Sequence, residues 1–256
     1  MNDKVIVITG ASAGIGAAVA EEVARRGARV VLAARRREVL EPLAQKLGGL
    51  AVVTDVTHRD QVERLRDRAI EKFGAIDVWI NNAGRAIWRP VSELTDADLD
   101  TMLTDNLKSV LYGIQSVLPH FKQRKRGHII SVSSGLSRFP FEPRRSAYSV
   151  AKSAVNALMA NLRVELRDGF PDIKCTTVIP GVVSTEFGVN ALHGGVDNRK
   201  LPNAQPVEEV AQVMADVVLH PRGEVYTRLQ MRDLAARYFS AEDPAIVENQ
   251  PPFRAP

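Results

Sequence analysis

The sequence lacks three features that would place it in a specialised class. It has one cysteine, Cys175, so no disulfide can form within the chain. The IKCTTVIP context of this cysteine predicts a buried strand position. No apolar run approaches the roughly 20 residues of a membrane-spanning helix, and the opening MNDKVIVITG has neither the charged leader nor the longer apolar stretch of a secretory signal. These absences favour a soluble, cytoplasmic protein that does not bind membranes.

Internal repeats, low-complexity tracts and domain linkers are lacking as well. At 256 residues, of which 45% are hydrophobic, the chain can bury a full core, so we expect residues 1–256 to form a single domain. The formal charge of +4 admits anionic partners. However, the basic run at 122–126 falls at an expected helix end, where cations complement the helix dipole. We therefore expect no nucleic-acid partner.

Short β-branched apolar runs alternate with longer amphipathic stretches, which is typical of a parallel sheet wrapped by helices. One helix is expected from Gly14 to Arg26, and a long helical stretch from Asp96 to Lys125, with Thr95 as its cap and a kink or break at Pro119. The expected strands are residues 5–8, 29–33, 50–54, 77–81, 128–132 and 174–179.

Two later segments show no comparable periodicity. Residues 182–205 are long enough to predict a lid over a substrate site. The C-terminal tail, residues 229–256, contains the short helical pattern DLAARYF and ends in NQPPFRAP, so we expect it to be loosely held.

A glycine-rich stretch, TGASAGIG at residues 9–16, follows the first expected strand directly and precedes the first helix. Such a strand, glycine turn and helix start present backbone amides to a pyrophosphate. A simple tight turn would need one glycine, whereas Gly10, Gly14 and Gly16 are all present. Their spacing differs from the longer G-x-G-x-x-G dinucleotide pattern.

Tyr148 and Lys152, in SAYSVAKS, lie four residues apart and so on one face of an expected helix. A cation beside a phenol would favour the phenolate and lower the tyrosine pKa toward the range useful for proton transfer. Such a pair also arises by chance, so it decides nothing alone.

Taken together, TGASAGIG, NNAG at residues 81–84, Ser134 and YSVAK resemble the short-chain dehydrogenase/reductase family in its compact branch. The resemblance runs from residue 4 to about Thr185. It implies an α/β fold with a doubly wound parallel sheet (Rossmann-like), with helices on both faces. It also implies an oxidoreductase that moves a hydride between a nicotinamide dinucleotide and a carbonyl or alcohol substrate.

The resemblance assigns four catalytic residues. Tyr148 would be the general acid/base, and Lys152 would lower its pKa and bind the nicotinamide ribose. Ser134 would hold the substrate oxygen, with Ser133 as the competing candidate. Asn106 would position a water in the proton path; alternatively it is a hydrogen-bonded polar residue within a helix.

The same resemblance predicts the cofactor. Ala34, rather than an acidic residue, ends the second expected strand and is followed by Arg35, Arg36 and Arg37. A guanidinium suits a ribose phosphate, so NADP(H) is preferred and NAD(H) is the alternative. Arg35 would be the main phosphate ligand, and Ser12 would assist it. No metal is expected.

The cofactor-binding residues expected are Gly10, Ser12, Gly14, Ile15, Gly16, Arg35, Asp55, Val56, Asn82, Ala83, Gly84, Tyr148, Lys152, Pro180, Gly181 and Thr185. Among these, Asp55 would meet the adenine amino group, Asn82 would line the ribose path, and Pro180 to Thr185 would contact the nicotinamide amide.

The substrate stays open. Trp88, Phe139, Phe141 and Phe187 favour an apolar substrate or act as packing anchors, and Arg144 and Arg145 either meet an acidic substrate or face water. His193, in the expected lid, is not assigned a role. The alternatives are an NAD-dependent alcohol dehydrogenase and a dinucleotide-sensing regulatory protein without turnover. A homo-oligomer is expected, with a dimer through the long helices favoured.

Overall fold

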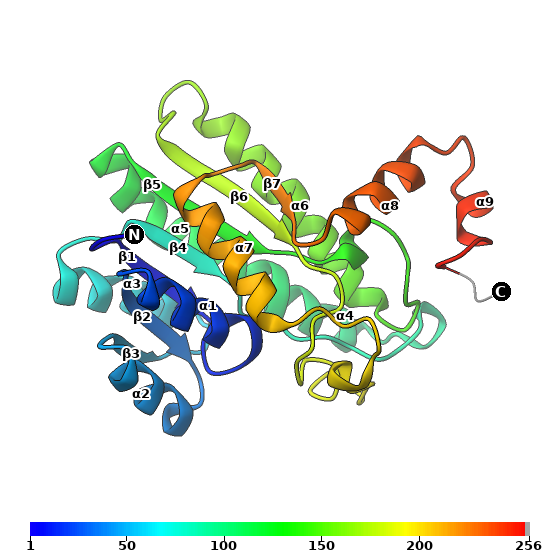
Figure 1. Cartoon of the computed structure of the whole chain (residues 1–256), viewed down its shortest axis with the longest axis horizontal. Coiled ribbons are helices and arrows are strands. Elements are labelled where there is room, and N and C mark those ends of the chain that lie inside the picture. The colour runs from blue at the N-terminus through cyan, green and yellow to red at the C-terminus, as the bar shows by residue number, and fades with distance from the viewer. Residues whose placement is uncertain (254–256) are drawn as a thin grey trace.

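The computed structural model describes residues 1–253, which form a parallel sheet of seven strands in the order β3-β2-β1-β4-β5-β6-β7 (Figure 1). The strands are β1 (Val5–Thr9), β2 (Arg29–Ala34), β3 (Leu50–Val53), β4 (Val78–Asn81), β5 (Gly127–Val132), β6 (Ile173–Ile179) and β7 (Glu224–Tyr226). The six expected strands are all present, within one residue at either end. β7 was not expected, because a three-residue strand is too short to show an alternating pattern.

The sheet is covered by helices on both faces, which confirms the expected doubly wound fold. In β1, Ile6 and Ile8 point into one core and Val5 and Val7 into the other, as expected for a strand buried on both sides. The first core is closed by α1 (Gly14–Arg25), α2 (Arg37–Lys46) and α7 (Val207–Leu219), and the second by α3 (Arg59–Phe73), α5 (Ser109–Arg124) and α6 (Ser146–Leu166).

The strand order reverses between β1 and β4, which are neighbours in the sheet. The chain leaves β1 into α1 on one face and, after β4, reaches α5 on the other. In open α/β sheets, ligands bind outside the carboxyl ends of the strands at such a reversal. The stretch at residues 9–16 follows β1 and NNAG lies at the end of β4, so both reach this point.

The long helical stretch of residues 96–125 is interrupted, but not at Pro119. It consists of α4 (Asp96–Leu103), a π-helical turn (Thr104–Lys108) and α5, and Pro119 lies inside α5. The expected break at Pro119 was therefore wrong: the helical hydrogen-bond ladder is disturbed at the π-turn, where an extra residue is accommodated. Thr95 caps α4 as expected, with its side chain accepting a hydrogen bond from the amide of Asp98.

The C-terminal segment packs on the rest of the fold, and its expected loose attachment stays a prediction. It contains α8 (Leu229–Ser240) and α9 (Pro244–Glu248), at one end of the molecule (Figure 1). Ala235 is buried, and Met231 packs so closely that a Cβ added at Gly135 would lie 2.5 Å from its Cε. Residues 254–256 of the expected tail lie outside the described residues. Within residues 1–253, no helix is both long enough and apolar enough to cross a membrane.

Candidate functional site

The glycine loop after β1 has a backbone that only small residues allow. Gly10 and Gly14 have φ angles of +67° and +54°, in the left-handed region that favours glycine. A Cβ added at Gly16 would lie 2.3 Å from the carbonyl oxygen of Gly10. Ala13, the N-cap of α1, provides no side-chain hydrogen bond to the first amides of the helix. These amides, at the positive end of the helix dipole, fit the phosphates of a dinucleotide.

Asn82 ties the loops after β1 and β4 together. Its Nδ2 donates to the carbonyl oxygens of Thr9, at 3.0 Å, and Gly10, at 3.3 Å. The amides of Asn82 and Ala83 both donate to the Thr9 hydroxyl, at 3.0 and 3.1 Å. The sequence reasoning missed Thr9, although a polar residue at the end of a buried apolar strand was an available signal. These bonds hold the glycine loop against β4; the expectation that Asn82 also lines the ribose path stays a prediction.

The arginines after β2 differ in their contacts. Arg36, rather than Arg35, reaches Ser12: its Nη2 donates to the Ser12 carbonyl and hydroxyl oxygens, each at 3.1 Å. Arg37 pairs with Glu41 at 2.5 Å. Arg35 is exposed and has no hydrogen-bond or ion-pair partner within residues 1–253, so its guanidinium is available to a ligand.

Asp55 lies in the loop after β3, on the same side of the sheet end as Arg35. Burial opposes its ionisation, but hydrogen bonds from the Thr57 amide and hydroxyl, and the positive charge of Arg35, outweigh this and lower its pKa. Asp55 is therefore an ionised acceptor, as a partner of an amino group would need to be.

Tyr148 and Lys152 lie in the first turns of α6, and both are buried. The Lys152 Nζ donates to the Val132 carbonyl oxygen at 2.9 Å and lies 5.7 Å from the centre of the Tyr148 ring. A Cβ added at Gly84 would lie 3.4 Å from this Nζ and 2.7 Å from Asn106 Oδ1. The structure thus brings the tyrosine–lysine pair, NNAG and Asn106 to one place.

The pKa values of Tyr148 and Lys152 differ from the expectation that the lysine lowers the pKa of the tyrosine. Burial raises the pKa of Tyr148 to about 12, and the nearby Ser134 side chain and the charge of Arg145 offset this only in part. Burial also lowers the pKa of Lys152 to about 8. Desolvation disfavours the charged form of either group, and here it outweighs the attraction that we expected between them. In this state Tyr148 is a protonated phenol at neutral pH.

The two candidate serines after β5 have different surroundings. The Ser134 side chain lies near enough to Tyr148 to lower its pKa in part, and its hydroxyl accepts from the Leu136 amide at 3.2 Å. The Ser133 hydroxyl donates to the Lys152 carbonyl oxygen and to the Ser137 hydroxyl, each at 3.2 Å. Ser134 is therefore the serine whose side chain lies beside Tyr148.

Asn106 lies in the π-helical turn, fully buried. Its Nδ2 donates to the carbonyl oxygens of Arg85, at 2.9 Å, and Met102, at 3.0 Å, and its Oδ1 accepts from the Arg85 amide at 3.2 Å. These contacts fit the alternative prediction, that Asn106 is a hydrogen-bonded polar residue within a helix. Its positioning of a water stays a prediction.

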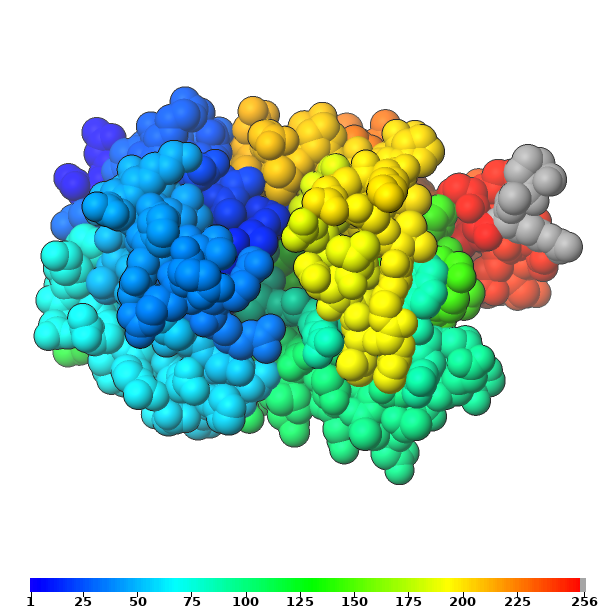
Figure 2. Space-filling view, turned by 90° about the horizontal axis from the view of Figure 1, so that it is seen from below, coloured from blue at the N-terminus to red at the C-terminus, as the bar shows by residue number. Residues whose placement is uncertain are grey.

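The segment 182–205 reaches from the glycine loop to the tyrosine. A Cβ added at Gly14 would lie 3.3 Å from Thr185 Cγ2, and the Phe187 and Tyr148 ring centres are 5.6 Å apart. The segment is closed at its base by the Val183–Gln205 bridge. In Figure 2 its yellow residues stand out from the surface next to the blue N-terminal elements.

His193, which the sequence reasoning left without a role, holds this segment to α4. Its Nε2 lies 2.6 Å from Asp98 Oδ1, and Arg89 Nη1 donates to Asp98 Oδ2 at 2.9 Å. The hydrogen bond from His193 holds the pKa of the buried Asp98 carboxyl well below its usual range. The partner is 95 residues away in sequence, so no local pattern could have identified it.

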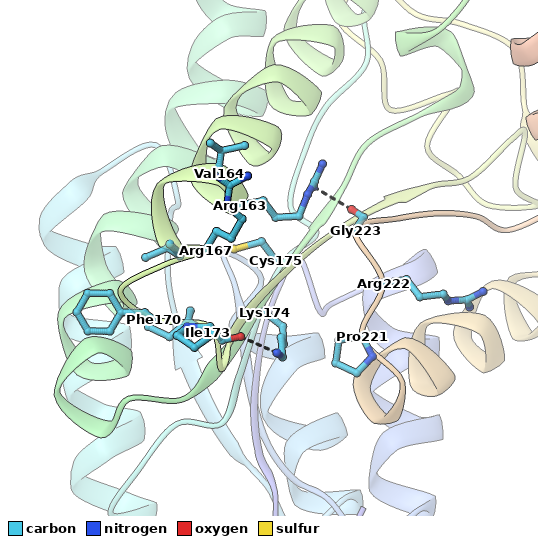
Figure 3. Close-up of a pocket in the computed structure, with 12 residues that line it drawn as sticks. Arg163, Val164, Arg167, Phe170, Ile173, Lys174, Cys175, Pro221, Arg222 and Gly223 are labelled. Atoms are coloured by element: carbon cyan, nitrogen blue, oxygen red, sulfur yellow. Dashed lines mark hydrogen bonds between the residues drawn. The ribbon is translucent and has the colours of Figure 1, made fainter.

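A surface hollow of about 440 Å³ lies elsewhere, at the amino ends of β6 and β7 (Figure 3). It is lined by the end of α6 and by residues around Cys175, whose pKa is raised to about 12 by burial. This thiol is not a reactive nucleophile. Because ligands of such sheets bind at the opposite strand ends, we place the functional site at Tyr148.

The sheet order, the glycine loop at the strand reversal and the buried Ser134–Tyr148 pair define a nucleotide-binding α/β protein. A family model for short chain dehydrogenases matches residues 4–194, and the chain belongs to this family. It is thus an oxidoreductase of the short-chain dehydrogenase family.

Related proteins agree with this assignment. An uncharacterized oxidoreductase of Listeria monocytogenes is 42% identical over 194 residues, covering 73% of this chain and 77% of the relative. One of Staphylococcus aureus is 33% identical over 225 residues, covering 87% of this chain and 94% of the relative.

Solved structures show the same fold. An alcohol dehydrogenase of the archaeon Thermococcus sibiricus, complexed with 5-hydroxy-NADP, has a TM-score of 0.75 at 28% identity, covering 88% of this chain and 96% of its own. The closed form of serine dehydrogenase complexed with NADP+ has a TM-score of 0.80 at 28% identity, covering 87% and 93%. A short chain dehydrogenase/reductase of Burkholderia phymatum in complex with NAD shares the fold at 24% identity, with a TM-score of 0.85 over 100% and 98% of the two chains.

Proposed function

We propose that the protein is an NADP-dependent oxidoreductase that interconverts a carbonyl compound and an alcohol, with Tyr148 as the general acid/base. The observation that carries the proposal is the buried Tyr148 side chain, beside Ser134 and one helical turn from Lys152. A proton donor, a second hydroxyl and a cation at one strand end suit a carbonyl oxygen that gains negative charge.

In the direction of reduction, bound NADPH would supply the hydride to the carbonyl carbon. The Ser134 hydroxyl would hydrogen-bond to the carbonyl oxygen and hold it beside Tyr148. Tyr148 keeps its proton at neutral pH, because burial raises its pKa to about 12, and would pass that proton to the oxygen. Lys152 would bind the cofactor ribose, and its positive charge would stabilise the phenolate left behind.

The preference for NADP rests on the arginines after β2. Arg35 has a free guanidinium, and Arg36 already lies on Ser12 at the edge of the glycine loop. The Arg36 guanidinium on the Ser12 hydroxyl, together with the unpaired Arg35 that precedes it in the chain, would suit a ribose phosphate. No acidic residue ends β2 to accept hydrogen bonds from an unphosphorylated ribose. The NADP ligands named for two of the similar structures support the same preference.

The test is a spectrophotometric screen for NADPH oxidation over aldehydes, keto-esters, quinones and steroids, followed by Tyr148→Phe. This variant should lose turnover by about 10²- to 10⁴-fold, while its affinity for NADPH, measured by fluorescence titration, stays close to that of the wild type. Tyr112→Phe, on α5 and packed against Arg59, is the matched control. Retained turnover in Tyr148→Phe would refute the role of the tyrosine, and equal affinities for NADH and NADPH would refute the cofactor preference.

A further inference from the structure

Arg145 is a buried cation without an ion-pair partner. It is the N-cap residue of α6 and only 6% exposed. Within residues 1–253 its guanidinium makes one hydrogen bond, from Nη1 to the Ile87 carbonyl oxygen at a long 3.3 Å, and no carboxylate pairs with it. Burying an unpaired charge is unfavourable, and here burial lowers the pKa of Arg145. The Trp88 ring, 5.0 Å from its guanidinium carbon, offsets this only in part.

The neighbouring arginines are different. Arg144 pairs with Glu142 at 2.8 Å, and Arg89 pairs with Asp98 at 2.9 Å. Glu142 acts on Arg145 only through longer-range attraction, and Arg144 opposes it. Glu142 and Asp98, the nearby carboxylates, thus pair with other arginines. Among the described residues, Arg145 keeps guanidinium N–H groups without a hydrogen-bond acceptor.

The position of Arg145 relative to the proposed reaction is specific. Arg145, Tyr148 and Lys152 are spaced three and four residues apart, so they follow one stripe of α6. Lys152 lies at the β5 end of this stripe, bonded to Val132, and Arg145 lies on the other side of Tyr148, against Ile87 and Trp88. Three residues of helix correspond to about 4.5 Å. A substrate whose oxygen meets Tyr148 and whose chain leads away from the cofactor therefore reaches Arg145 within a few bonds.

We propose that Arg145 binds a carboxylate of the substrate, so that the enzyme acts on oxo acids and the corresponding hydroxy acids with the carboxylate a few bonds from the reacting carbon. A guanidinium presents parallel N–H donors that match the two oxygens of a carboxylate. Burial against Ile87 and Trp88 limits the access of water and strengthens this pairing. The inference rests on the proposed function and adds the substrate class to it.

The test compares acids with their neutral esters. NADPH-dependent reduction of 2-oxobutanoate, 3-oxobutanoate and 4-oxopentanoate, and of their methyl esters, is measured for the wild type, Arg145→Gln and Arg145→Lys, with Arg144→Gln as the control. The wild type should favour at least one acid over its ester by about 10- to 100-fold in kcat/KM. Arg145→Gln should lower kcat/KM for that acid by a similar factor, chiefly through KM, and should change the value for the ester far less. Arg145→Lys should restore part of the preference, and Arg144→Gln should retain it.

The outcomes separate this inference from the proposed function. Two results would overturn the role of Arg145 and leave the proposed function standing. One is an equal kcat/KM of the wild type for acids and esters. The other is an equal loss of kcat/KM for acids and esters in Arg145→Gln, with no recovery of the preference for acids in Arg145→Lys. Absence of turnover with every carbonyl compound in the wild type would overturn both. NADPH titration of each variant identifies any that fails to fold.

Discussion

The cofactor side and the substrate side of the functional site are built in different ways. The cofactor side consists of short consecutive stretches, residues 9–16 and 81–84, in which Gly10 and Gly16 pack against Asn82 and Ala83 with no room for a side chain. The substrate side, around Tyr148, is assembled from distant segments: Ile87 and Trp88, Asp98 in α4, the 182–205 segment and Met231 in α8.

This difference separates two kinds of constraint. On the cofactor side, the backbone conformation and the close approach of backbone segments fix the shape of the site. A single added methyl group should therefore force the backbone to shift. On the substrate side, side-chain contacts between separate segments fix the shape, and each contact can change without unfolding the sheet. Segments of the second kind are where members of one fold acquire different substrates.

The largest effect is expected from Gly16→Ala, which breaks the cofactor side. The new Cβ would lie 2.3 Å from the Gly10 carbonyl oxygen and 2.6 Å from Asn82 Nδ2, so the loop must shift. Overpacking of this kind costs about 1–3 kcal/mol, and we expect at least a tenfold loss of NADPH affinity by fluorescence titration. Gly169→Ala is the control, because no atom lies within 4 Å of its added Cβ. An unchanged NADPH affinity in Gly16→Ala would show that the loop is not constrained as described.

A second effect is expected at Lys152, which lies where the two sides meet. Its pKa is lowered by burial from 10.5 to about 8, so between these values the unfolded chain binds more protons than the folded one. The stability of the wild type should therefore rise with pH in this window, relative to Lys152→Met, by about 2 kcal/mol from pH 7 to 9.5. The measurement is urea unfolding of both proteins at the two pH values. The exposed Lys72→Met is the control, and parallel behaviour of the wild type and Lys152→Met would contradict the lowered pKa.

The same contrast explains how much could be inferred from the sequence. The glycine loop and the tyrosine–lysine pair depend on neighbouring residues, so spacing alone placed them on the correct turn and helix. Six strands were found because each is long enough for its apolar run to be visible, whereas the three-residue β7 was not.

What sequence reasoning missed depends on side-chain direction or on distant partners. Arg35 and Arg36 are adjacent and chemically equal, and only the path of the chain after β2 directs Arg36 to Ser12. The π-turn that holds Asn106 depends on its bonds to Arg85 and Met102. The pKa of Tyr148 depends on complete burial, which outweighs its neighbours. None of these causes is visible in a short stretch of sequence.

The smallest effect is expected from Asp98→Asn, which tests the substrate side. Asp98 accepts hydrogen bonds from His193, Arg89 and the Thr95 amide, so the variant weakens the attachment of the 182–205 segment while leaving the glycine loop intact. Hydrogen–deuterium exchange should become faster in residues 182–205 and stay unchanged in residues 9–16. Asp60→Asn, which removes an exposed ion pair with Arg64, should change neither region.

Acid should reproduce this weakening in the wild type. The pKa of Asp98 is lowered chiefly by the hydrogen bond from His193, against the opposing effect of burial. A carboxyl with a lowered folded-state pKa stabilises the fold above its unfolded value, about 4, and loses that contribution as the pH falls through its folded value. In thermal unfolding between pH 6 and pH 3, the difference in Tm between the wild type and Asp98→Asn should therefore become smaller toward pH 3. A difference that stays constant across this range, together with unchanged exchange in residues 182–205, would mean that apolar packing around Phe187 and Leu192, and not the Asp98–His193 pair, holds the segment in place.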